Sequence, residues 1–324
     1  MEIKQNTPAN MGKRVLSGAV ILILLATFLL VREVAESAKF IFDVFVGFLM
    51  ITGTFEVENL LKQMDRHAFS LALGIYPLLC FSLLILSVAY NLGLIAFLLL
   101  TILALFVLIL VFFACSMIAK KQTLKKMNLD NFEGKRTDYC VQKSLNTVIA
   151  CIYPTFLLCF VFLINHFNAF SGVTTNIDLG LFGLILLFVS TMFSDTFAML
   201  VGRCIKSKKI NLKKLGPGKS WSGFVGGIFG AMLGAFLVFI VFQNVGYKEV
   251  FAENNLAFWQ FLIGGFFCGV VNMCGDIVSS YIKRCAGIKD FSNFIPGHGG
   301  VMDRINGLVF NSVFIYVFMS IVLA

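Results

Sequence analysis

Long apolar stretches separated by short polar segments dominate the hydrophobic pattern of this chain. Crossing a hydrocarbon core of about 30 Å takes about 20 helical residues, and most of the stretches reach or approach that length. Because lipid offers the backbone no hydrogen bonds, each stretch is predicted to be a helix, and the short alternating segments of a membrane β-barrel do not appear. About nine helices are predicted, near residues 14–31, 40–55, 69–89, 92–118, 144–165, 178–201, 223–244, 258–279 and 307–324.

Composition supports the same class. The chain has 324 residues, of which 59% are hydrophobic and 13% charged, whereas soluble domains are about 45–50% apolar and about 25% charged. The prediction is therefore an all-α polytopic integral membrane protein. The first stretch follows Lys13 and Arg14 as a signal peptide would, but it lacks a clear small-residue cleavage site, so we expect a retained helix. The nine cysteines form no CxxC pair, which favours small core residues over the alternative of disulfides or a metal site.

The formal charge of +9 comes from Lys and Arg between the apolar stretches, so a nucleic-acid partner is not expected. The alternate segments 166–177 and 245–257 hold few cations. Cytoplasmic loops of membrane proteins carry an excess of Lys and Arg. With nine helices all basic segments fall on one side, which predicts a cytoplasmic N-terminus and catalytic loops on the cytoplasmic side. The basic segments are residues 4–14, 120–143, 203–219 and 283–304.

The two halves of the chain differ in character. Residues 1–143 contain about four predicted helices with unremarkable loops, and residues 144–324 contain about five. From about residue 178 onward, acids lie inside or at the ends of apolar helices, beside glycine-rich basic loops. The first part is therefore predicted to be an N-terminal membrane region, and the second a catalytic transmembrane domain.

Two acids, Asp195 and Asp276, lie late in apolar stretches. A carboxylate within a membrane helix costs on the order of 3 kcal/mol, so it usually faces a wet cavity and has a partner. The alternative is an acid at a helix end, at the level of the lipid headgroups. Asp276, Ser280 and Lys283 follow i, i+4, i+7 spacing and share one helix face. An acid, a hydroxyl and an ammonium group on one face suit a metal–phosphate site.

The segment after this helix combines cations with a glycine-rich turn. Because Gly297, Gly299 and Gly300 have no side chains, their backbone N–H groups can approach an anion closely. Asp276 and Asp303 offer oxygen ligands to Mg²⁺, which commonly binds one or two carboxylates together with substrate phosphates. Together these features point to phosphoryl chemistry at a membrane surface.

The stretch from Ser280 to Arg304 resembles the signature of the phosphatidate cytidylyltransferase (CDP-diacylglycerol synthase) family, S-x-hydrophobic-KR-x4-KD-x-small-x2-hydrophobic-P-x-HGG-hydrophobic-x-DR. This match is long and gapless. Asp195 to Arg203 is similar to the D-[ST]-G-A-Y-x2-G-[RK] motif of the family, and residues 217–227 are similar to its SPxKTWxGxxGG motif. The resemblance covers about residues 190–310.

The chain departs from the family pattern at three places. Phe197, Ala198 and Met199 stand where Gly-Ala-Tyr is usual, and Gly216 stands where Ser usually precedes the proline. Asn306 replaces the acid that commonly ends the DR-x-D element. Asparagine keeps an oxygen ligand but loses a charge, so a metal contact there would be weaker.

The resemblance implies an enzyme of phospholipid biosynthesis, in which the phosphate of phosphatidic acid attacks the α-phosphorus of CTP to give CDP-diacylglycerol and pyrophosphate. Mg²⁺ would bind Asp276 and Asp303, with Asp195 in the same pocket, and a second metal ion would fit the same chemistry. His298 would either contact a phosphate or order the turn. The implied phosphate-binding cations are Lys219, Lys283, Arg284, Lys289 and Arg304. The remaining implied binding residues are Ser220, Ser280, Gly297, His298, Gly299 and Gly300.

The expected setting is the plasma membrane, with membrane lipids as neighbours, and the resemblance implies a homodimer. Three alternatives stay open. A related CTP-dependent enzyme would act as a lipid kinase or on another lipid phosphate. A transporter would use its intramembrane acids to relay ions, but would release no pyrophosphate from CTP. An inactive relative is suggested by Asn306.

Overall fold

The structure is a computed structural model that describes residues 11–118, 136–171, 177–205, 207, 219–254, 256–295 and 299–323, with only the backbone for residues 11–15 and 136. Helices make up nearly all of these ranges. An isolated antiparallel bridge pairs Ile295 with Gly299. The predicted all-α class is confirmed.

Nine long helical rods run through the described residues. Eight are long and apolar enough to cross a membrane, and α1 adds a shorter apolar stretch, so the prediction of about nine helices is confirmed. The rods are α1 (Met11–Arg32), α2 (Lys39–Gln63), α3 (Ser70–Ala89), α4 (Leu94–Ile118), α6 (Arg136–Ala150) with the π-helical Cys151–Phe156 and α7 (Leu157–Asn165), α9 (Leu179–Cys204), α10 (Trp221–Asn244), α12 (Phe258–Cys285) and α13 (Met302–Val322). Two short helices, α8 (Phe167–Ser171) and α11 (Lys248–Glu253), lie in connections.

Helix α2 is longer than the range 40–55 expected from the sequence, which ended the helix too early. Glu56 and Glu58 interrupt the apolar pattern, but both side chains are buried at 6% and 2% exposure. Each carboxylate accepts hydrogen bonds from groups outside its own helix. The helix therefore continues to Gln63 through positions that look like a polar end.

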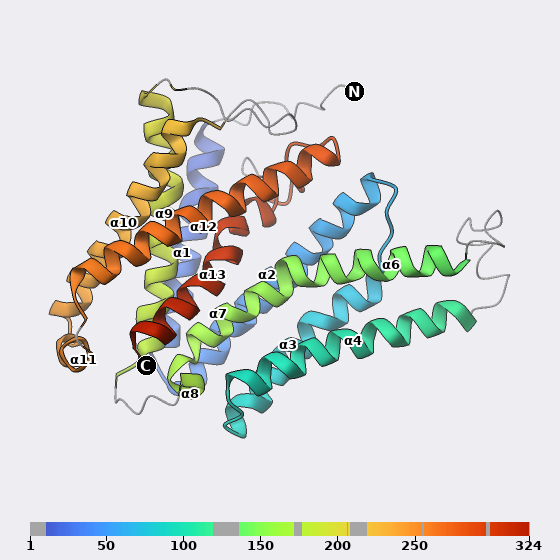
Figure 1. Ribbon diagram of the computed structural model, residues 1–324, viewed down its shortest axis with the longest axis horizontal. Helices are drawn as coiled ribbons and strands as arrows, with labels where there is room; N and C mark the ends of the chain where they lie inside the picture. Colours follow the sequence, from blue (N-terminus) through green and yellow to red (C-terminus); the bar gives the residue numbers. More distant parts are fainter. Residues whose placement is uncertain are drawn as a thin grey trace.

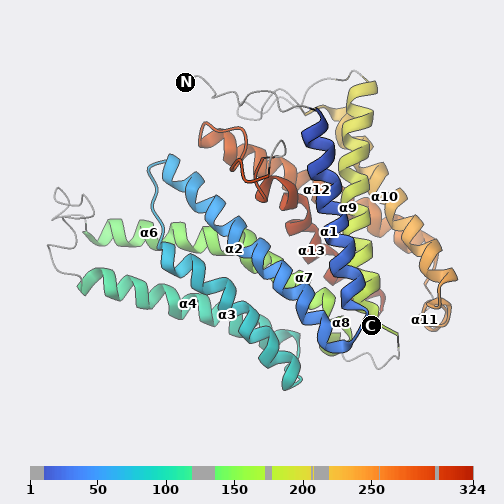
Figure 2. The same cartoon turned by 180° about the vertical axis from the view of Figure 1, so that it is seen from behind.

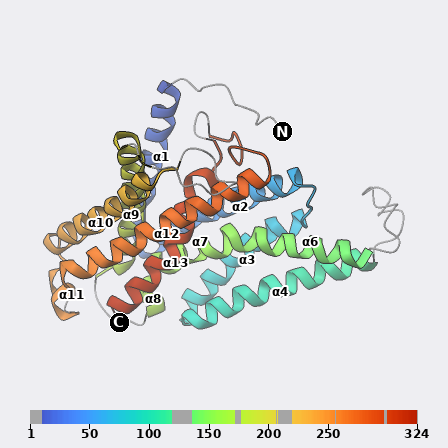
Figure 3. The same ribbon diagram turned by 45° about the horizontal axis from the view of Figure 1, so that its top comes forward.

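The helices form two groups joined by a central layer (Figures 1 and 2). Helices α3, α4 and α6 make one group, and α9, α10 and α12 make the other, with α2, α7 and α13 between them. The tilted view in Figure 3 shows the same separation. Since α13 contacts α2 and α7 as well as α9 and α12, it connects both groups.

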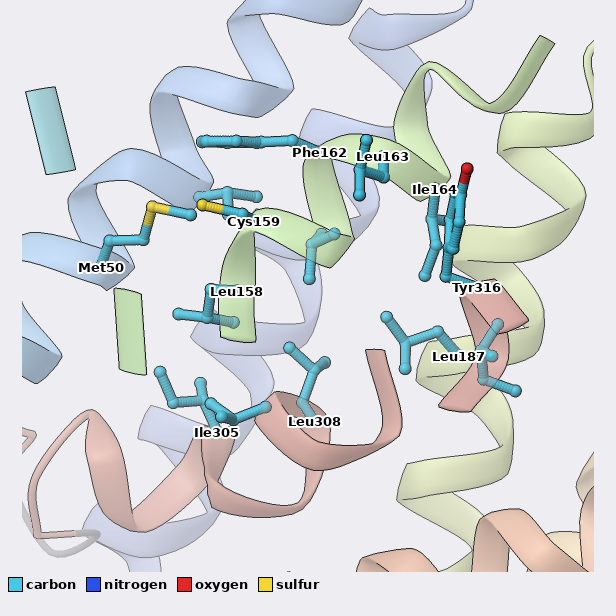
Figure 4. Packing of buried hydrophobic residues seen from close by; sticks show 14 of the residues in the cluster. Met50, Leu158, Cys159, Phe162, Leu163, Ile164, Leu187, Ile305, Leu308 and Tyr316 are labelled. Atoms are coloured by element: carbon cyan, nitrogen blue, oxygen red, sulfur yellow. The ribbon is translucent and has the colours of Figure 1, made fainter. Parts of the chain in front are cut away.

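The central layer is closely packed. Buried apolar side chains from α2, α7, α9 and α13 meet there, among them Met50, Phe162, Leu187 and Leu308 (Figure 4). Helix association in membranes depends on this kind of van der Waals packing. The packing fixes the position of α13 relative to the N-terminal helices.

Helices α9, α10 and α12 approach each other closely through glycines. A Cβ at Gly230 of α10 would lie 2.5 Å from the carbonyl oxygen of Phe193 in α9, and one at Gly269 of α12 would lie 2.6 Å from Cα of Ile228 in α10. No side chain fits at these distances, and small residues are the usual means of close contact between membrane helices. The contact brings the C-terminal end of α9 and the N-terminal end of α10 to the upper edge of the molecule in Figure 1.

A buried polar cluster holds the opposite ends of the helices together. The Arg32 guanidinium at the end of α1 lies 2.9 Å from Asp178, which precedes α9, and Lys39 of α2 lies 3.2 Å from the same carboxylate. His166 Nε2 lies 2.7 Å from Asp43 Oδ2. Burial would raise the pKa of Asp178, but Arg32 and Lys39 outweigh it and lower that pKa below its ordinary value. The cluster therefore ties α1 and α2 to α9 through charge.

Candidate active site

A cavity of about 500 Å³ lies where α9, α10, α12 and α13 come together. The C-terminal halves of α9 and α12 contribute to its wall, together with the residues just before α10 and the first turns of α13. Six predicted site residues from distant parts of the sequence line this cavity: Asp195, Lys219, Ser220, Asp276, Asp303 and Arg304.

Two asparagines orient the two acids that were predicted from the apolar stretches. Asn272, one turn before Asp276 on α12, donates its Nδ2–H to Oδ1 of Asp195 on α9 at 2.7 Å. Asn306 of α13 donates its Nδ2–H to Oδ1 of Asp276, also at 2.7 Å. Each amide leaves the Oδ2 atom of its acid outside the bond. Acids within membrane helices usually have such partners, and these bonds fix both carboxylates at the cavity wall.

Cations balance these acids. Lys219 Nζ lies 3.4 Å from Oδ2 of Asp276. Burial lowers the pKa of the Lys219 ammonium below its ordinary value, while Asp276 acts in the opposite direction. The side chains of Arg203 and Arg304 also line the cavity. These three cations offer charged donors for the oxygens of a phosphate group.

The start of α10 faces the same cavity. Ser220 is the N-cap residue, and its Oγ accepts a hydrogen bond from the backbone N–H of Gly223 at 3.2 Å. Serine is a preferred N-cap because its oxygen satisfies an N–H group that has no partner within the helix. The positive end of the helix dipole adds to the attraction for anions. Ser220 therefore has a structural role at the cavity edge.

The carboxylate of Asp303 is surrounded by donors. Its Oδ1 accepts from Lys283 Nζ at 2.6 Å, and its Oδ2 accepts from the backbone N–H groups of Phe291 and Gly300, each at 2.9 Å. The side chain is only 4% exposed. Both oxygens of Asp303 thus have partners within the protein, and these bonds organise the loop between α12 and α13. The predicted role of Asp303 as a Mg²⁺ ligand stays a prediction.

The carboxylates of the cavity meet the smaller of the two requirements for a metal site. Among the residues that the structure describes, no group of three or more His, Cys, Asp or Glu side chains is arranged to hold a metal. Mg²⁺ usually takes one or two carboxylates and completes its shell with water and substrate phosphates. Asp195 and Asp276, which both line the cavity, fit that smaller requirement. Asn306 does not add a free oxygen, because its Oδ1 accepts from the N–H of Gly307 at 2.8 Å.

Four predicted site residues of α12 and the following loop do not line the cavity. Lys283 is directed to Asp303, and Arg284 donates to the carbonyl oxygen of Ile288 at 3.2 Å, which closes the end of α12. Lys289 is exposed and Ser280 is half-buried. Their predicted contacts with substrate phosphates therefore stay predictions, and the structure gives Lys283 and Arg284 a role in shaping the loop.

The described glycines of the turn use their amides within the protein. Gly299, with a φ of +86°, donates its N–H to the carbonyl oxygen of Ile295 at 3.1 Å, and Gly300 donates to Asp303. Their N–H groups thus brace the turn, and the predicted contact with an anion stays a prediction. Two further predicted binding residues lie outside the described residues: Gly297 and His298.

Glu56, beside this site, is among the residues that the sequence reasoning missed, together with Arg203 and Asn272. Glu56 belongs to α2, in the region predicted to carry no chemistry, yet its carboxylate reaches the start of α13. It accepts from the N–H groups of Val301 and Met302 at 2.9 and 2.7 Å, and from Ser292 Oγ at 2.5 Å. The signal was present in the sequence, since a carboxylate within an apolar stretch calls for a partner.

Comparisons with known proteins show the family of the chain. Residues 12–322 match the model of the cytidylyltransferase family. A phosphatidate cytidylyltransferase of Haemophilus influenzae is 38% identical over 129 residues, which are 40% of this chain and 42% of the relative. One of Thermotoga maritima is 32% identical over 173 residues, which are 53% of this chain and 58% of the relative. An uncharacterised Escherichia coli protein, YnbB, is 34% identical over 144 residues, 44% of each chain.

The similarity to these relatives is thus partial, and the chain spans about half the length of the curated relatives it matches, from 42% to 58% for the two enzymes above. The family model, in contrast, runs from the first described helix to the last. This polytopic membrane protein therefore belongs to the cytidylyltransferase family.

Proposed function

We propose that the protein is a CTP:phosphatidate cytidylyltransferase, which transfers CMP from CTP to phosphatidic acid and produces CDP-diacylglycerol and pyrophosphate. The observation that carries the proposal is the cavity in which Asp195 and Asp276 lie beside Lys219 and Arg304, at the ends of membrane helices. Relatives named phosphatidate cytidylyltransferase add support. A site at helix ends suits a reaction between a water-soluble nucleotide and a lipid.

The proposed reaction needs little covalent chemistry from the protein. A phosphate oxygen of phosphatidic acid attacks the α-phosphorus of CTP, and a new P–O bond forms. The bond between the α-phosphorus and the bridging oxygen breaks, and pyrophosphate leaves with the electron pair. Since the attacking phosphate is already ionised, no strong general base is required. Transfers of this kind depend on in-line positioning and on neutralisation of charge.

The cations of the cavity have the matching role in the proposal. Lys219, Arg203 and Arg304 bind the phosphate groups of CTP and of the lipid, assisted by the start of α10. The acids Asp195 and Asp276 would hold Mg²⁺, which when bound would neutralise phosphate charge and polarise the phosphoryl group. The hydrogen bonds from the two asparagines keep these acids directed to the cavity.

The setting of the protein is also part of the proposal. The N-terminal end of α1 and the ends of α9 and α10 that line the cavity lie at the same edge of the molecule (Figure 1). The basic segments of the sequence flank these ends. This supports a cytoplasmic N-terminus and a site that opens to the cytoplasm. We place the enzyme in the plasma membrane, and infer the homodimer from the resemblance alone.

The division of the chain into an N-terminal part (1–143) and a catalytic part (144–324) is kept as a proposal about function. The boundary falls inside a continuous helical rod, Thr137–Asn165. The N-terminal part also contributes Glu56 to the loop next to the cavity. The two parts are thus proposed to differ in chemistry while folding against each other.

Labelled nucleotides test the reaction class. Purified protein in detergent micelles is given phosphatidic acid, Mg²⁺ and CTP that carries the label on either the α- or the γ-phosphorus. Cytidylyl transfer puts the α-label into the lipid and the γ-label into pyrophosphate. Transfer of the γ-label to a lipid would instead identify a CTP-dependent kinase, and no labelled lipid from folded protein would contradict the proposed reaction.

A further inference from the structure

The carboxylate of Glu56 lies against the first turn of α13, although Glu56 belongs to a helix more than two hundred residues earlier in the chain. It accepts from the backbone N–H groups of Val301 and Met302 and from the hydroxyl of Ser292. The Glu56 side chain is 6% exposed, so these donors replace water. Glu56 thus joins the N-terminal helices to the loop that precedes α13.

Helix α13 depends on this contact for its N-terminal end. The first N–H groups of a helix have no partner within the helix, and the N-cap residue, Val301, has no side chain that can supply one. A carboxylate is also favoured at this end by the helix dipole. Glu56 therefore caps α13 from another helix, and its loss would leave buried N–H groups without a partner.

The first turns of α13 carry residues of the cavity. Arg304 lines it directly, and Asn306 both lines it and holds Asp276 at 2.7 Å. We propose that Glu56 is a positioning residue of the active site, which fixes the start of α13 so that Arg304 and Asn306 face the cavity. The kinetic part of this inference rests on the proposed function. Glu56 itself does not line the cavity.

The residues around the Glu56 carboxylate leave no room for a side chain at position 300. A Cβ at Gly300 would lie 2.6 Å from Oε2 of Glu56, so a side chain at that position would displace the carboxylate. On the other side, α2 packs against the same turn, since a Cβ at Gly53 would be in ordinary contact with Sδ of Met302 at 3.5 Å. The loop and α2 are therefore fitted around Glu56.

Glu58 provides a matched control two residues further along α2. It is also buried, at 2% exposure. Its carboxylate interacts with Lys62 at 2.9 Å and with the hydroxyl of Ser70, which are both residues of the N-terminal half. Replacing Glu58 therefore removes a buried carboxylate of the same helix without touching the loop or the cavity.

Kinetics of the full chain test the proposal. Glutamine at position 56 keeps one acceptor oxygen but turns an NH₂ group toward backbone donors. Because a misplacement of about 1 Å can cost on the order of 100-fold in rate, Glu56→Gln is expected to lower kcat by roughly 10- to 100-fold. KM for CTP should change by less than about threefold, because Lys219 and Arg203 lie outside α13 and keep their contacts with the triphosphate. Glu58→Gln should keep kcat per folded protein within about twofold of wild type.

Hydrogen exchange gives a readout that does not need turnover. The peptide amides of Val301 and Met302 should exchange faster in Glu56→Gln than in wild type, and should be unchanged in Glu58→Gln. If Glu56→Gln does not fold, Ser292→Ala takes its place in the kinetic measurement, with a smaller expected loss of kcat, because the two backbone donors keep their bonds to Glu56. An unchanged kcat in an active enzyme, or unchanged protection of the two amides, overturns the proposal. If the wild-type protein shows no cytidylyl transfer, the proposed function is overturned. The exchange measurement then still tests whether Glu56 holds the start of α13.

Discussion

Replacing Lys283 by methionine should destabilise the protein strongly. Lys283 and Asp303 form an ion pair of 2.6 Å between side chains that are 13% and 4% exposed. Removing one partner of a buried pair costs about 3–5 kcal/mol, because the other charge stays buried without compensation. The carboxylate would keep two backbone donors at 2.9 Å, from Phe291 and Gly300. The expected loss is therefore near the lower end of the range, about 3 kcal/mol.

Thermal unfolding in detergent, followed by circular dichroism, measures this effect. At about 2–4 °C per kcal/mol, the midpoint of Lys283→Met should fall by roughly 6 °C or more. The double variant Lys283→Met/Asp303→Asn lacks both charges of the pair and should recover at least part of the loss, as a double-mutant cycle detects. Lys289→Met is the matched control, because Lys289 is an exposed lysine of the following loop. A midpoint of Lys283→Met within about 1 °C of wild type, or a double variant that unfolds as early as the single one, would refute the reasoning.

Three further predictions concern other contacts. Gly300→Ala should lower the unfolding midpoint and kcat together, because its Cβ would lie 2.6 Å from Oε2 of Glu56. Such overpacking costs about 1–3 kcal/mol, and a variant as stable and active as wild type would contradict this prediction. Asn306→Asp should replace an amide donor by a second carboxylate beside Asp276, so it should unfold earlier without Mg²⁺ and gain more from added Mg²⁺ than wild type does. Because the pKa of Asp178 is lowered in the folded protein, its ionisation contributes stability above the unfolded pKa of about 3.9, and this contribution is lost as the pH falls through the folded pKa. The unfolding midpoint of Asp178→Asn should therefore depend less on pH below about pH 4 than the midpoint of wild type does. If the midpoints of the two proteins changed equally with pH, the ion pairs would be excluded as the cause.

The helices were largely predictable from the sequence, whereas some of their ends were not. Apolar length is a local property, so the long apolar stretches predicted the membrane helices of the structure. The end of α2 was placed too early because Glu56 and Glu58 look like a polar terminus. Their burial depends on donors from other parts of the chain, which hydropathy does not reveal.

The site was predictable in composition but not in pairing. Because an acid within an apolar stretch costs free energy, Asp195 and Asp276 were predicted as site residues. Both line one cavity. Helical spacing grouped Lys283 with Asp276, whereas the ammonium is bonded to Asp303 across the following turn. Such a contact depends on how a loop folds back, and periodicity along one helix does not describe it. The same holds for Glu56, whose partners lie in the last helix and the loop before it.

The central claim is that the cavity between α9, α10, α12 and α13 is the site of cytidylyl transfer. The most direct measurement compares Asp276→Asn with Glu249→Gln, an exposed acid on α11, in an assay with α-labelled CTP, phosphatidic acid and Mg²⁺. We expect wild type and Glu249→Gln to form labelled CDP-diacylglycerol only with Mg²⁺, and folded Asp276→Asn to form almost none. Wild-type levels of product from Asp276→Asn would contradict the assignment of the cavity.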